Sequence, residues 1–90
     1  MKLRLKNDKA EEFFTNLRIA GYDFDYCDLD GITRIYKKMK AENIKNVLVG
    51  KINTWNNVIE FYSGNTQNEF INLLMLLTQE KQYFMEYKNE

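Results

Sequence analysis

The chain has 90 residues, 44% of them apolar, and its 13 basic and 13 acidic side chains leave no net charge. A chain of this length builds one hydrophobic core, so we expect a single domain over residues 1–90. Its one cysteine excludes an intrachain disulfide and favours a reducing compartment, and the N-terminal residues lack the apolar segment of a signal peptide. We therefore expect a cytoplasmic protein that does not cross a membrane.

The residue types that most catalytic and metal sites require are scarce. The chain has no histidine, which is the side chain best suited to proton transfer near neutral pH and the commonest metal ligand. Its four glycines form no phosphate-binding fingerprint. We expect neither an enzyme nor a bound metal ion or cofactor.

The first third of the chain reads as strand, helix and strand. Residues 2–6 alternate apolar and basic side chains, which is typical of a half-buried strand. Asp8, three residues before Glu11, resembles a capping box and opens a helix over 9–20 that ends at Gly21. Residues 22–27 alternate aromatic and polar side chains and predict a second strand.

A hairpin follows, because Asp30-Gly31 suits a two-residue type I′ turn. The chain then returns as a strand over 32–40, although the apolar spacing of that segment fits a helix as well. A two-residue turn sets the register, with Asp23 opposite Lys38 and Asp25 opposite Tyr36.

The second half predicts two more strands, over 44–53 and 58–62. Thr66 and Glu69 match a capping box and begin a helix that runs at least to Gln79, with nothing to stop it before Tyr87. The order is β-α-β-β-β-β-α. Short connections favour an α+β fold, a two-layer sandwich in which two helices pack on a mainly antiparallel sheet of four to five strands.

Residues 22–30 carry a charge of −4, and two interpretations stay open. An EF-hand calcium loop fails, because Tyr26 and Lys37 fall at its first and twelfth ligand positions. The acids either pair internally within the hairpin or form a contact surface for a basic partner. The candidate partner-binding acids are Asp23, Asp25 and Asp28.

Two apolar features suggest contact with another protein. Trp55 lies in a polar loop, where it either folds back on the core or meets a partner. The C-terminal helix is apolar nearly all round and is followed by Tyr83 and Tyr87, more than one sheet face can cover. We expect these residues to contact a partner protein or, in a homodimer, a second copy; simple core packing is the alternative.

The segment 31–59 carries a charge of +5 and supports a second hypothesis. Cations interleaved with an aromatic side chain suit a phosphate backbone and a stacked base. A solvated strand protected by lysines is the ordinary alternative. The candidate nucleic-acid residues are Arg34, Tyr36, Lys37, Lys38 and Lys40.

Taken together, these features predict a small non-catalytic interaction or regulatory module that binds a protein, with a nucleic-acid-binding domain as the alternative. The residue usage, with 11 Asn, 10 Lys against 3 Arg, and 7 Ile, corresponds to AT-rich codons. It suggests a low-GC bacterium, or one of its phages or plasmids, as the source. A concrete hypothesis is an accessory protein of a phage or mobile element that inhibits a host factor such as a defence nuclease.

Overall fold

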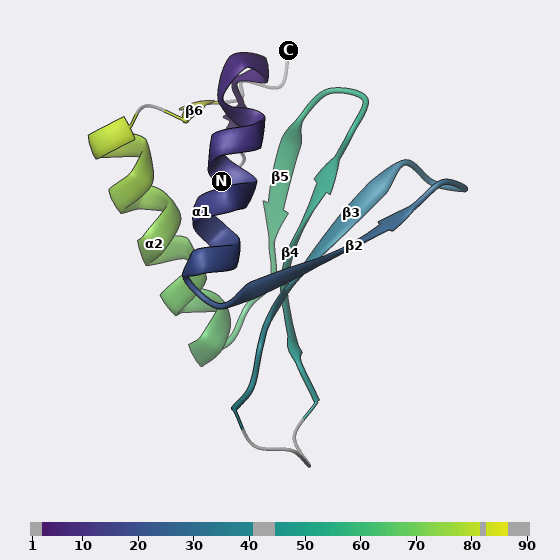
Figure 1. Cartoon of the computed structure of the whole chain (residues 1–90), viewed down its shortest axis with the longest axis vertical. Helices are drawn as coiled ribbons and strands as arrows, with labels where there is room; N and C mark the ends of the chain where they lie inside the picture. Colours follow the sequence, from purple (N-terminus) through teal and green to yellow (C-terminus); the bar gives the residue numbers. More distant parts are fainter. Residues whose placement is uncertain (1–2, 41–44, 82, 87–90) are drawn as a thin grey trace.

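A computed structural model describes residues 3–40, 45–81 and 83–86 (Figure 1). The elements, in chain order, are β1 (Leu3–Leu5), a 3-10 turn η1 (Asn7–Lys9), α1 (Ala10–Ile19), β2 (Tyr22–Cys27), β3 (Ile32–Lys37), β4 (Val47–Asn53), β5 (Val58–Phe61), α2 (Asn65–Lys81) and β6 (Phe84–Glu86). The predicted α+β fold is confirmed, and residues 32–37 form a strand and not a helix.

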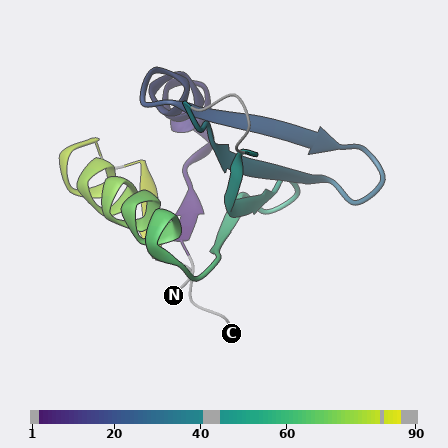
Figure 2. The ribbon, with the colours of Figure 1, turned by 90° about the horizontal axis from the view of Figure 1, so that it is seen from below.

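The strands form one sheet in the order β2-β3-β4-β5-β1-β6, and every neighbouring pair is antiparallel. Both helices lie on the same face of this sheet (Figure 2). The β2–β3 hairpin extends beyond the helices, so neither helix covers its far end. We call the face opposite the helices the open face.

The core lies between the sheet and the two helices. Helix α1 contributes Phe13 and Leu17, and α2 contributes Phe70 and Leu74. The apolar residues of the alternating patterns point inward, so burial of their side chains stabilises both layers. The strand residues of this core include Leu3, Leu5, Ile35, Val49, Ile52 and Ile59.

The chain turns back after α2 and adds a strand that the sequence analysis did not anticipate. Continuation of the helix toward Tyr87 is wrong, because α2 ends at Lys81 and β6 pairs with β1. Tyr83 and Phe84 are buried, and both rings contact the ring of Phe13. Burial of two aromatic side chains together with new strand hydrogen bonds outweighs a longer helix.

The β2–β3 hairpin is confirmed, but its predicted register is wrong. The turn has four residues, 28–31, instead of two. The Asp30 carboxylate accepts a hydrogen bond from Ile32 N–H at 3.0 Å, and Gly31 N–H donates to the Cys27 carbonyl at 3.0 Å. These bonds stabilise the wider turn. The observed pairs are Asp23 with Tyr36, Asp25 with Arg34 and Cys27 with Ile32.

Candidate protein-contact surface

The β2–β3 turn (28–31) and the β4–β5 turn (54–57) are joined at one end of the sheet (Figure 1). The backbone N–H and the hydroxyl of Thr54 both donate to the Gly31 carbonyl, at 2.9 and 2.7 Å. A Cβ on Gly31 would lie 2.5 Å from Nε1 of Trp55, so the indole rests against this turn. The two turns therefore present their side chains as one unit.

Exposed apolar side chains gather at these turns. Leu29 is 97% exposed, Trp55 87% and Tyr26 53%, and the structure thus places Trp55 in solvent and not in the core. We call these three residues the hairpin-tip surface. Among the described residues only two other large apolar side chains are exposed, Ile19 and Leu76, both on helices. Large apolar side chains that stay exposed at one end of a molecule are typical of an interaction site.

The candidate acids lie along β2 and in the turn that follows it. Tyr22 and Phe24 pack toward the helices, so strand alternation places Asp23 and Asp25 on the open face. Both are exposed, as is Asp28 in the turn, and none of the three belongs to an ion pair among the described residues. They leave a concentrated negative charge at the edge of the sheet.

Asp30 differs from the other acids of the segment because it has a cationic partner. Arg34 Nη2 lies 3.1 Å from Asp30 Oδ2, and this hydrogen bond holds the pKa of the Asp30 carboxyl below its ordinary value. Internal pairing, one of the two interpretations of this segment, is therefore observed for Asp30.

Tyr83, a predicted contact residue, belongs to the core. Its side chain is fully buried, and its hydroxyl accepts a hydrogen bond from Asn16 Nδ2 at 2.5 Å. Burial, with a contribution from Glu12, raises the pKa of Tyr83. The prediction that Tyr83 contacts a partner is therefore wrong, because its side chain is buried in the core. Tyr87 lies outside the described residues. A homodimer through α2 stays a prediction, and the helix offers Leu76, which is half-exposed.

The predicted nucleic-acid residues do not form one surface. Arg34 and Tyr36 lie on the open face of β3, whereas Lys37 lies on the helix side opposite Tyr22. Lys37 Nζ donates to the Ala20 carbonyl at 3.3 Å and lies 4.7 Å from the centroid of the Tyr22 ring. A separate hollow of about 820 Å³ at the end of α1 is lined in part by Lys37, Lys38 and Lys40.

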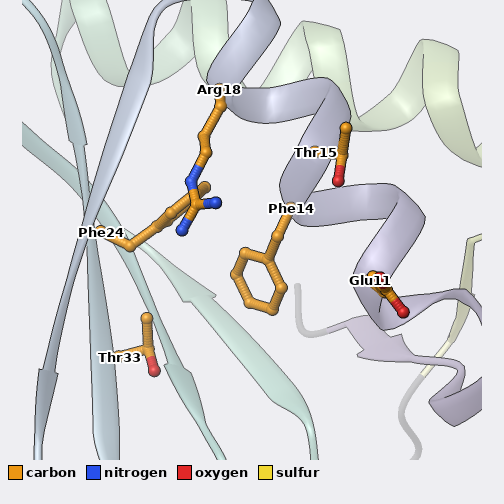
Figure 3. Close-up of a pocket in the computed structure, with 6 residues that line it drawn as sticks. All are labelled: Glu11, Phe14, Thr15, Arg18, Phe24 and Thr33. Atoms are coloured by element: carbon orange, nitrogen blue, oxygen red, sulfur yellow. The ribbon is translucent and has the colours of Figure 1, made fainter.

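A groove of about 390 Å³ lies in the angle between α1 and the β2–β3 hairpin (Figure 3). Phe14 and Phe24 meet edge to face in it, with ring centroids 4.8 Å apart. The Arg18 guanidinium lies 5.5 Å from the Phe24 centroid. The remaining lining residues of the groove are Glu11, Thr15 and Thr33. The two aromatic rings suit contact with an apolar group of a ligand, and the four polar side chains of the lining suit hydrogen bonds to it.

Tyr26 and Leu29 are not among the contact residues predicted from the sequence. A leucine between Asp28 and Asp30 in a turn was the available signal, because turns seldom bury a side chain. Tyr26 was assigned to a half-buried strand, and it is exposed because the hairpin extends past the helices.

Comparison of the chain with protein families, curated proteins and solved structures finds no match. Within residues 3–40, 45–81 and 83–86, no three side chains are placed to hold a metal ion together, and no helix is long and apolar enough to span a bilayer.

Proposed function

We propose that this protein is a small non-catalytic interaction module that binds a protein partner through the hairpin-tip surface. One observation carries the proposal: Leu29 and Trp55 are almost fully exposed on two turns that are hydrogen-bonded to each other. Tryptophan and tyrosine are enriched among residues that dominate binding energies. A pair of tethered turns also holds such anchors in place before binding, which reduces the entropy lost on association.

The acids along β2 and in its turn define the charge of the partner. Asp23, Asp25 and Asp28 are exposed and add to the negative potential at the edge of the sheet. A basic surface on the partner complements them, and such complementarity raises association rates and selects the partner. The apolar anchors supply affinity, and the acids supply orientation.

The test is affinity capture from a low-GC bacterial lysate with the tagged protein, with and without nuclease. We expect a protein to be captured in stoichiometric amount and to stay bound after nuclease treatment. A tagged Ile19→Ser variant should still capture it, and a tagged Leu29→Ser variant should not. Ile19 is the matched control because it is 80% exposed but lies on α1. Loss of a binding hot spot costs about 2 kcal/mol or more, roughly thirtyfold in affinity. Equal capture by both variants would refute the role of the tip.

The residue usage favours a concrete form of this function, an accessory protein of a phage or mobile element that inhibits a host factor. A defence nuclease has the required chemistry, because a channel that binds nucleic acid is basic and complements the acids of β2. Titrating the captured nuclease with the purified protein should abolish its activity at equal molar amounts. Unchanged nuclease activity would remove this form of the proposal.

Nucleic-acid binding is the alternative, and the hollow lined by Lys37, Lys38 and Lys40 is the observation that favours it. Phosphate contacts give an affinity that falls log-linearly with salt concentration. Fluorescence anisotropy with labelled single-stranded DNA and RNA measures this directly. Steep salt dependence that a K37Q/K38Q/K40Q variant removes would support the alternative, and absence of binding at low salt would exclude it.

A further inference from the structure

Strand β2 forms one edge of the sheet, because β3 is the one strand that pairs with it among the described residues. The Gly21 carbonyl accepts a hydrogen bond from Lys38 N–H at 3.0 Å, so Gly21 faces β3. Backbone groups alternate in direction along an antiparallel strand. The N–H and C=O groups of Tyr22, Phe24 and Tyr26 therefore face away from the sheet.

A side-chain contact agrees with this assignment. Asp23 Oδ1 accepts a hydrogen bond from Phe24 N–H at 3.0 Å, which is possible because that N–H is not part of the β2–β3 ladder. Among the described residues, Tyr22 and Tyr26 have no hydrogen bond to their amides on this side. The amides of Tyr22 and Tyr26 are thus open to a new partner, and the Phe24 N–H can exchange its bond to the Asp23 side chain for one to a partner carbonyl. Such an edge is a template for one more strand.

The side chains of β2 specify what such a strand must carry. Phe24 and Tyr26 lie on the helix side, where Phe24 lines the groove of Figure 3. Asp23 and Asp25 lie on the open face. Directly opposed residues of neighbouring strands share a face and interact. An added strand therefore needs apolar side chains on the helix side and basic side chains on the open face.

A second copy of the same strand does not meet this requirement. Backbone hydrogen bonds to a second copy need the outward-facing residues, so in an antiparallel pair of β2 strands Tyr22, Phe24 and Tyr26 of one copy lie opposite residues of the same set in the other. Asp23 then lies opposite Asp25 in the register centred on Phe24, and Asp25 opposite itself in the next. Like charges directly opposed destabilise strand pairs, and the acids thus protect this edge from self-association.

We propose that the free edge of β2 binds an extended segment of the partner protein in which basic and apolar residues alternate, and that this segment becomes a seventh strand. Backbone hydrogen bonds to Phe24 and Tyr26 supply affinity, and cation pairing with Asp23 and Asp25 selects the sequence. The inference rests on the proposed function and names the chemistry of the partner.

The folded chain itself provides the probe. In a D23K/D25K variant, β2 alternates two basic side chains with Phe24 and Tyr26, which is the pattern required of the partner. Mixed with the wild-type protein in sedimentation experiments at low salt, it should associate at least about tenfold more strongly than either protein alone. Association of the mixture no stronger than that of either protein alone would overturn the inference.

Two controls separate edge pairing from general attraction between unlike charges. An Asp28→Lys variant changes charge in the turn, outside the strand, and should not associate with the wild-type protein. Tyr26→Pro in both partners removes an outward N–H that the sheet does not use, and should abolish association, whereas Tyr26→Ala should preserve it. Equal association of the proline and alanine variants would overturn the backbone part of the inference.

If circular dichroism shows that D23K/D25K does not fold, a synthetic peptide of alternating lysine and valine replaces it. We expect this peptide to perturb the amide resonances of residues 22–27 in the wild-type protein, and N-methylation of alternate peptide amides to remove the effect. Unperturbed resonances would overturn the inference. If the edge test fails but capture of the partner still depends on Leu29, the proposed function stands and only the edge inference falls. If the edge test succeeds but capture does not depend on Leu29, only the role of the hairpin-tip surface falls.

Discussion

Gly31 is the residue on which contact between the two hairpin turns depends. Its φ is +65°, in the left-handed region that favours glycine, and its carbonyl accepts both hydrogen bonds from Thr54. The sequence alone indicates a glycine turn at this position. It does not indicate that Trp55 lies against it, because that contact joins residues of two different hairpins.

We predict that Gly31→Ala lowers the free energy of unfolding, because the left-handed conformation costs a non-glycine residue about 1–2 kcal/mol and the new methyl group displaces the Trp55 indole. In a Trp55→Ala background, Gly31→Ala should lower the free energy of unfolding by less, since only the backbone strain remains. Urea denaturation followed by far-UV circular dichroism measures both differences. An equal cost in the two backgrounds would contradict packing of the indole on the turn.

At the scale of elements, strand and helix patterns predicted most of the fold, and tertiary contacts decided the rest. The alternation of Leu3 and Leu5 and the apolar run after Thr66 led directly to β1 and α2. Strand β6 was missed because no helix breaker precedes it in the sequence. Its position depends on buried contacts with α1 and β1, which local patterns do not report.

The C-terminal strand makes the next prediction. Tyr83→Phe removes the hydrogen bond from Asn16 and should lower the stability at neutral pH by about 1 kcal/mol. The pKa of Tyr83 is raised in the folded protein, so its neutral form stabilises the fold below the ordinary tyrosine pKa of about 10, and this contribution is lost as pH rises through the folded value.

Thermal unfolding of the wild-type and Tyr83→Phe proteins between neutral and alkaline pH tests this. The difference in stability between them should narrow as the pH rises. A constant difference across the range would show that the Tyr83 hydroxyl does not titrate differently in the folded and unfolded chains.

At the scale of the whole molecule, charge is segregated although the net charge is zero. The acidic segment, residues 22–30 with a net charge of −4, is evident from the sequence. Strand alternation alone predicts that the basic residues of β3 are divided between the two faces, and the structure agrees: Arg34 and Tyr36 lie on the open face and Lys37 on the helix side. Three-dimensional placement, unlike composition, therefore favours the acids as the coherent charged surface.

We predict that raising ionic strength slows association with the captured partner by about tenfold between low and high salt, because the acids steer a basic surface. A D23N/D25N/D28N variant should lose most of this dependence. A D8N/E12Q/E69Q variant removes three exposed acids elsewhere and should retain it. Surface plasmon resonance measures the association rates, and an identical salt dependence in the two variants would contradict steering by β2.

The position of Trp55 has a practical consequence. It is the only tryptophan of the chain, and it lies at the tip of the proposed contact surface, open to water. Indole emission shifts to shorter wavelengths when water is excluded from the ring. The unmodified protein thus carries its own optical reporter at the site where binding is proposed, and occupancy of the tip can be followed in solution without an added dye.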